Sequence, residues 1–153
     1  MLTQVAGRAG RTQKRGKVII QTYNPYHKIL QQVTTGDYEA MYSEQLYERQ
    51  QYHYPPHNRI IRITMKHKAF HTLNEASEWF GRSLRQQFGE WILGPEYPAI
   101  PRIRNQYLKH ILIKIPRSQS IVKTKNSIKR IEQSFNAISQ YRGVRVIYDV
   151  DHL

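Results

Sequence analysis

Apolar residues recur with two different periods in residues 59–153. In three segments apolar and polar residues alternate, which is the pattern of a strand with one buried face. Two longer segments carry apolar residues three, four and seven positions apart, which predicts amphipathic helices. A shorter apolar run follows the first of these helices. The predicted strands are 59–66, 91–93, 107–115 and 144–150, and the predicted helices are 68–88 and 120–138.

The order of these elements is strand, helix, strand, strand, helix, strand, which predicts an α+β fold of the ferredoxin-like class. Each helix has one apolar stripe, so we expect both helices to pack on the same face of a four-stranded antiparallel sheet. The polar positions of the strands then form the opposite, open face. The side chains expected on this open face are Arg62, Thr64, Lys66, His110, Leu112, Lys114, Arg145, Ile147 and Asp149.

The first 58 residues have a different pattern. The apolar run 18–20 is of the kind that is buried as a strand of a parallel sheet. Residues 27–33 predict a short helix that ends at Gly36. Asp37 is expected to cap a second helix that continues to about residue 51. Tyrosines recur at helical spacing on that second helix and are expected to pack; they include Tyr38, Tyr42 and Tyr47.

Two prolines and a change in charge mark a boundary. Pro55 and Pro56 cannot continue the second helix, so we predict one domain over 1–58 and another over 59–153. The net charge is +13, and residues 59–153 carry 17 Lys and Arg against 7 Asp and Glu. Such an excess indicates a polyanionic partner, because Lys and Arg displace counterions from phosphates. The residues predicted to contact DNA phosphates are Arg62, Lys66, Lys114 and Arg145.

Several functional classes are excluded or disfavoured. The chain has no cysteine, which excludes disulfides and thiolate metal sites. His67 and His71 are four residues apart, but no third ligand follows at a suitable spacing, so we predict no metal site. No apolar run approaches the length of a membrane span, and the N-terminus has no apolar signal segment. These features favour a soluble cytoplasmic protein.

Residues 4–11 form the sharpest motif in the chain. They read Gln-Val-Ala-Gly-Arg-Ala-Gly-Arg, with Arg8 and Arg11 three positions apart. Two guanidinium groups at this spacing point the same way from one helical turn and suit a triphosphate. Gly7 and Gly10 allow the backbone to approach such a ligand closely.

This octet resembles motif VI of superfamily 2 helicases, in the form found in the primosomal protein N′ family of replication-restart DNA helicases. The resemblance runs nearly end to end and is strongest over 1–56. It implies that 1–58 are the C-terminal tail of a RecA-like motor lobe, and that the last domain is related to ribosomal protein S10 (an S10-like fold). Two positions depart from the family pattern: His57 replaces a usual Phe, and His152 replaces a common Pro. Other residues that carry the resemblance are 16–25, 37–40, Arg49, Tyr54, Pro55, Pro56, Gly94, Pro95, Arg104, Tyr107 and 149–151.

The resemblance also implies a function for the longer protein. Members of the family hydrolyse ATP with Mg²⁺, translocate 3′ to 5′ on DNA and recognise branched forks to restart replication. Gln4, Gly7, Arg8 and Arg11 would then belong to the ATP site, with both arginines at the γ-phosphate. Single-stranded-DNA-binding protein and other primosome proteins would be partners, in the nucleoid of a bacterial cytoplasm.

The catalytic parts of such a helicase are missing from the 153 residues. The phosphate-binding loop, the acidic magnesium box and the family's zinc-binding cysteines are all absent. We therefore expect this chain alone to bind DNA or partners, without a cofactor and without ATPase activity. The alternative function is a free-standing S10-like nucleic-acid-binding module.

Overall fold

The computed structural model describes residues 17–151, which divide into two compact units. The first unit ends at Glu48 and the second begins at Arg49. The division therefore lies before the predicted boundary at residue 58. The octet 4–11, and with it Gln4, Gly7, Arg8 and Arg11, lies outside the described residues.

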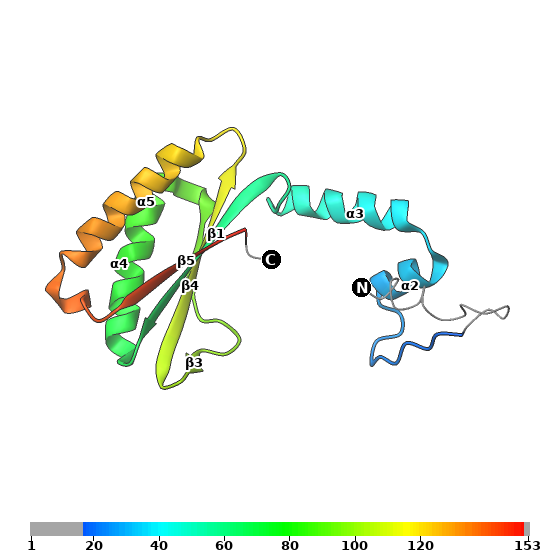
Figure 1. Ribbon diagram of the computed structural model, residues 1–153, viewed down its shortest axis with the longest axis horizontal. Helices are drawn as coiled ribbons and strands as arrows, with labels where there is room; N and C mark the ends of the chain where they lie inside the picture. Colours follow the sequence, from blue (N-terminus) through cyan, green and yellow to red (C-terminus); the bar gives the residue numbers. More distant parts are fainter. Residues whose placement is uncertain (1–16, 152–153) are drawn as a thin grey trace. The chain divides into compact units, whose positions relative to one another are not determined.

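Two helices dominate the described part of the first unit: α2 (Lys28–Thr35) and α3 (Tyr38–Gln51), which runs on into the second unit (Figure 1). Helix α2 ends at Gly36, whose φ of +72° is the left-handed conformation that glycine adopts most easily. Oδ1 of Asp37 accepts a hydrogen bond from the N–H of Ala40 at 3.0 Å. The predicted cap of α3 is therefore confirmed.

Two expectations for this region are wrong. Residues 18–20 form no strand, and the side chain of Ile19 is 82% exposed. A parallel strand needs a hydrogen-bonded neighbour, and the described residues of the first unit contain no strand that could pair with it. The tyrosines Tyr38, Tyr42 and Tyr47 are exposed rather than packed, because α3 buries no residue within the described chain.

The second unit is built on an antiparallel sheet. Its strands are β1 (Asn58–His67), β2 (Ile92–Glu96), β3 (Arg102–Ile103), β4 (Gln106–Pro116) and β5 (Arg145–Val150). The order across the sheet is β2-β4-β1-β5, with the short β3 paired to β4. The two long central strands are therefore β1 and β4. This order and the antiparallel pairing confirm the predicted ferredoxin-like α+β architecture.

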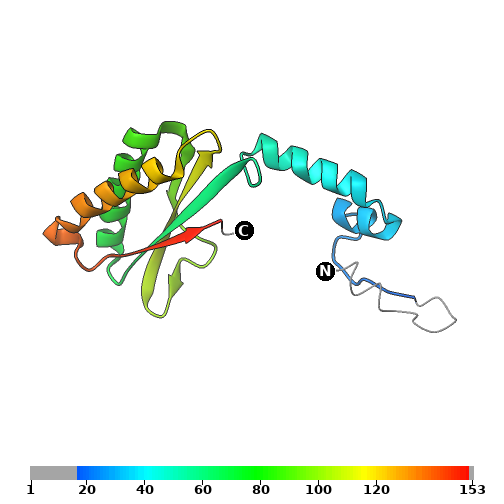
Figure 2. The ribbon, with the colours of Figure 1, turned by 45° about the horizontal axis from the view of Figure 1, so that its top comes forward.

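Two helices, α4 (Phe70–Phe88) and α5 (Ile121–Asn136), cover one face of this sheet (Figures 1 and 2). Gly89 ends α4 as predicted, and Ser120 begins α5 with its Oγ accepting from the N–H of Lys123. Short 3-10 turns follow each helix, η1 (Gly89–Trp91) and η2 (Ser139–Tyr141). The core between helices and sheet includes Ile61, Ile63, Met65, Leu73, Phe80, Leu84, Ile111, Ile113, Ile128 and Phe135.

Phe70 departs from the predicted buried stripe of α4. Its side chain is 44% exposed because α4 begins at this residue, which places the ring at the rim of the core. There it stacks on Tyr97, with ring centroids 6.0 Å apart, and meets the edge of Tyr107 at 5.4 Å. Leu73, Phe80 and Leu84 of the predicted stripe are buried, and Phe88 at its end is partly buried.

The sheet face away from the helices is only partly open. Ile60 and Leu108 point to this face by their register, yet they are 1% and 5% exposed. The segment before β1 lies against one end, where the carbonyl of Tyr52 accepts a hydrogen bond from Lys114. The segment before β3 lies against the other end, where the N–H of Leu108 donates to the carbonyl of Pro101 at 2.8 Å. In the middle, Thr64 is also buried, at 9%. Exposure on this face is therefore greatest along its edge strands, at Leu93 of β2 and Arg145 of β5.

Gly81 lets α4 approach β2 closely, and its replacement has a predictable effect. A Cβ at this position would lie 2.8 Å from Cδ of Pro95, closer than real Cβ contacts come. A Gly→Ala replacement at an exposed position inside a helix normally raises the free energy of unfolding by about 1 kcal/mol. For Gly81→Ala we expect the opposite sign, a loss of about 1–2 kcal/mol in the free energy of unfolding, because the packing must open.

Urea unfolding followed by circular dichroism measures the effect of Gly81→Ala. The exposed Gln87 on the same helix provides the control, and Gln87→Ala should change the free energy of unfolding by less than about 0.5 kcal/mol. A gain in stability for Gly81→Ala would show that α4 and β2 are not in close contact at Gly81.

Candidate nucleic-acid interface

The four basic residues predicted to contact DNA all lie on the sheet face away from the helices. Arg62 and Lys66 alternate along β1 with the core residues Ile63 and Met65. The register places Lys114 opposite Ile60 and Arg145 opposite Lys66. All four side chains therefore share one surface, but their surroundings differ.

Arg62 is already paired with an acid. Its Nη2 lies 2.9 Å from Oδ2 of Asp149, directly across the β1–β5 pair. Both side chains are only partly exposed, at 29% and 45%. The charge of Arg62 is therefore largely balanced within the sheet, and the guanidinium is held in place by its partner.

Lys114 is held by the segment that precedes β1. Its Nζ donates to the carbonyl of Tyr52 at 2.6 Å and lies 4.1 Å from the centroid of the Tyr54 ring. A cation over an aromatic face is attracted by the negative charge of the ring. Burial lowers the pKa of the Lys114 ammonium below its usual value, because a less polar environment disfavours the charged form. Lys114 therefore fixes this segment against the sheet.

Lys66 and Arg145 differ from the other two. They face each other directly across the β1–β5 pair, where β1 nears its end and β5 begins. Neither side chain makes a hydrogen bond or ion pair with a residue between 17 and 151. Like charges directly opposite on neighbouring strands destabilise a sheet. These two residues form the basic end of the sheet, which is the part of the face with uncompensated positive charge.

The middle of the face carries the apolar residues that the alternation predicted, together with one acidic residue, Glu96, that was not predicted there. Leu112 lies beside Arg62, Ile147 lies beside Thr64, and Glu96 of β2 pairs with His110. Positive charge without a partner is therefore concentrated at one end of this face, at Lys66 and Arg145. Sequence reasoning missed the compensation by Asp149, although the alternation along β5 already placed that residue on this face.

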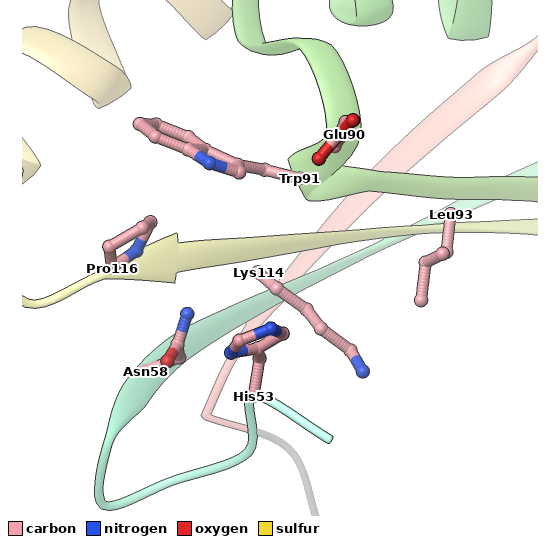
Figure 3. A pocket seen from close by; sticks show the side chains of 7 residues that line it. All are labelled: His53, Asn58, Glu90, Trp91, Leu93, Lys114 and Pro116. Carbon is pink, nitrogen blue, oxygen red and sulfur yellow. The ribbon is translucent and has the colours of Figure 1, made fainter. Parts of the chain in front are cut away.

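A pocket lies on the same face, at the opposite end of β1 from Lys66. It has a volume of about 260 Å³ and is lined by side chains from three stretches of the chain, 53–58, 90–93 and 114–116 (Figure 3). Asn58 and Pro116 come from the paired ends of β1 and β4. Sequence reasoning did not identify this pocket. Its lining residues are His53, Asn58, Glu90, Trp91, Leu93, Lys114 and Pro116.

The basic residues of α5 lie on the other side of the unit. Lys123 and Arg130 are exposed, and they lie on a different face of α5 from the buried Ile128 and Phe135. Since α5 covers the core face of the sheet, these residues do not adjoin the basic end formed by Lys66 and Arg145 (Figure 2). They form a solvated face of α5.

The described residues contain no group of three His, Asp or Glu side chains placed to hold a metal ion. Within 17–151, none of the helices is long and apolar enough to cross a membrane.

Comparison with known proteins gives consistent results. Residues 50–153 match the family model described as the primosomal protein N C-terminal domain. Over 153 residues the chain is 31% identical to replication restart protein PriA of Bacillus subtilis (strain 168), which covers 99% of the chain and 19% of that protein. It is 35% identical to replication restart protein PriA of Synechocystis sp. over 136 residues, or 86% of the chain and 16% of that protein.

The Thermotoga maritima protein of the same name is 33% identical over 115 residues. The chain thus spans about a fifth or less of the length of these relatives. The family model covers well over half of the chain, and its bounds coincide closely with the second structural unit. The chain therefore belongs to the family of the primosomal protein N C-terminal domain.

Proposed function

We propose that residues 49–153 form a DNA-binding domain that acts in replication restart, at the C-terminal end of an ATP-dependent 3′–5′ DNA helicase. The observation that carries this proposal is the match over 99% of the chain to a protein named replication restart protein PriA. The excess of basic residues in 59–153, 17 against 7 acidic ones, supports DNA as the direct ligand.

The basic end of the sheet is the proposed phosphate contact. Lys66 and Arg145 repel each other across the β1–β5 pair, and a phosphate between them would replace repulsion by two attractions. Arg62 and Lys114 have partners within the unit, so they have less to gain from a phosphate. We therefore assign the main electrostatic contribution to Lys66 and Arg145, and a smaller one to Arg62 and Lys114.

ATP hydrolysis is assigned to the longer protein. Arg8 and Arg11 would contact the γ-phosphate of ATP and Mg²⁺ held by another motor lobe, with Gln4 and Gly7 beside them. The 153 residues contain no phosphate-binding loop, so the chain alone has nothing to catalyse. Single-stranded-DNA-binding protein and other primosome proteins are the proposed protein partners.

DNA binding is tested by fluorescence anisotropy with labelled forked and single-stranded oligonucleotides and the full chain. We expect both to bind at low salt, with little sequence preference. The logarithm of the binding constant should fall linearly with that of the salt concentration, by about 0.7–0.9 per phosphate contact. An absence of binding at low salt would refute the proposed function.

A further inference from the structure

The pocket beside Lys114 is lined by a polar group that no other side chain of the described residues engages, the carboxamide of Asn58. Asn58 is 9% exposed, and its carboxamide makes no hydrogen bond with any residue that the structure describes. The carboxamide points toward the space bounded by Pro116, Lys114 and His53 (Figure 3). The oxygen of a carboxamide accepts hydrogen bonds and its nitrogen donates them. The position of Asn58 in the pocket wall therefore suits a ligand that brings both a donor and an acceptor.

We propose that this pocket binds a single unpaired nucleobase of the DNA, which deepens the proposed function and rests on it. The edge of a nucleobase presents adjacent donors and acceptors, and an asparagine carboxamide can contact two of them at once. Adenine offers the best match, since its amino group and ring nitrogen complement the oxygen and nitrogen of the amide.

The walls of the pocket suit a flat ring. Trp91 lines it from η1, and the ring of Phe88 stacks against Trp91 with centroids 6.4 Å apart. The contact with Phe88 holds the indole of Trp91 in place and leaves part of the indole surface for a ligand. Pro116 and Leu93 supply apolar contact from β4 and β2. Stacking on an aromatic side chain is the usual way in which proteins hold single-stranded bases, whatever their identity.

The volume of the pocket also suits one base. At about 260 Å³ it lies just below the range of about 300–1,000 Å³ typical of pockets for larger ligands. Lys114 lies at the side of the pocket. A phosphate attached to the nucleoside of a bound base would lie near its positive charge. Glu90 and His53, on opposite sides of the pocket, complete its polar rim (Figure 3).

The position of the pocket agrees with the basic end of the sheet. Asn58 and Lys66 lie on the same face at opposite ends of β1. A DNA strand held at Lys66 and Arg145 could therefore cross the sheet and place a base at Asn58. In between, the face carries the apolar Leu112 and Ile147. It also carries Arg62, whose charge is balanced by Asp149.

The first experiment does not depend on DNA binding. Trp79 is replaced by Phe in the full chain, so that Trp91 is the only source of indole fluorescence. Titration with deoxyadenosine monophosphate should change this fluorescence in a saturable way, whereas deoxyribose 5-phosphate should leave it unchanged. Equal responses to both compounds would mean an anion site without base recognition, and would overturn the proposal.

Variants identify the contacts. Asn58→Ala should weaken binding of the nucleotide by about 5- to 100-fold, because the two-point contact with the base edge is lost. The double variant Lys123→Ala/Arg130→Ala has exposed substitutions on α5 and should bind as the Trp79→Phe chain does. Unchanged binding by Asn58→Ala, with its circular dichroism spectrum intact, would contradict the assignment.

A second experiment separates this inference from the proposed function. Single-stranded oligonucleotides that carry either adenine or an abasic position at one central site are compared by anisotropy. We expect the base to strengthen binding by about 5- to 100-fold in the parent chain and to have little effect in Asn58→Ala. Binding of both oligonucleotides with equal affinity would refute the pocket and leave the DNA-binding function standing. If no oligonucleotide binds, the proposed function fails, and the mononucleotide titration still decides whether the pocket recognises a base.

Discussion

Replacement of Phe135 by alanine is expected to lower the free energy of unfolding of the second unit by about 3–5 kcal/mol. Phe135 is fully buried, and its ring meets three other aromatic rings. The centroid distances are 5.1 Å to Phe80, 5.3 Å to Tyr141 and 5.8 Å to Trp79. These contacts join α5 to α4 and to η2, so the cavity left by the ring cannot close without moving a helix.

A loss of this size is a large part of the stability of an ordinary domain, which is about 5–15 kcal/mol. Urea unfolding should show a much lower midpoint for Phe135→Ala at an unchanged slope. Phe70→Ala is the matched control, since Phe70 is 44% exposed at the rim of the core. We expect Phe70→Ala to lower the free energy of unfolding by about 1 kcal/mol. Equal losses for the two variants would contradict the packing of α5 on α4.

The double variant Lys66→Ala/Arg145→Ala should bind DNA on the order of 50-fold more weakly at about 0.1 M salt. Each phosphate contact gains from the release of a counterion, and two such contacts are lost together. The repulsion between Lys66 and Arg145 across the β1–β5 pair also disappears. The variant should therefore be at least as stable as the parent chain, which urea unfolding can measure.

The control for this variant removes the same charge from the opposite side of the unit. Lys123→Ala/Arg130→Ala should lower DNA affinity only slightly, because both residues are exposed on α5, which packs on the other face of the sheet. A similar loss of affinity in the two double variants would mean that net charge, and not the basic end of the sheet, determines binding.

Periodicity predicted the architecture of the second unit because each element buries one face. The alternation of Ile61, Ile63 and Met65, and the stripe of Leu73 and Phe80 on α4, fixed which side of each element meets the core. The ferredoxin-like order then follows from the sequence of elements. Pattern alone could not place the apolar run at 18–20, because a strand of a parallel sheet depends on neighbours elsewhere in a protein.

The binding surface was predictable only in part. The sequence pattern predicted that Arg62, Lys66, Lys114 and Arg145 lie on one face. It could not show which of these charges are paired with other residues. The ion pair of Arg62 with Asp149 joins residues far apart in the chain, and so does the contact of Lys114 with Tyr52. Such pairings depend on strand register and loop position, which the sequence pattern does not encode.

The pocket could not be predicted for a similar reason. Its lining residues lie between positions 53 and 116, in three stretches of the chain that meet only where β1, β2 and β4 come together. Asn58 carries no signal in the sequence, because an asparagine before a strand is common in turns. Its position in the wall of a pocket is visible only in the folded chain.

The salt dependence of DNA binding is the most direct test of the assigned surface. Binding constants for a single-stranded oligonucleotide are measured by anisotropy over a series of salt concentrations, for the parent chain and both double variants. The slope for Lys66→Ala/Arg145→Ala should be smaller in magnitude than that of the parent chain by about 1.4, while the slope for Lys123→Ala/Arg130→Ala should be nearly unchanged. Identical slopes for the parent chain and Lys66→Ala/Arg145→Ala would contradict phosphate binding at the basic end of the sheet.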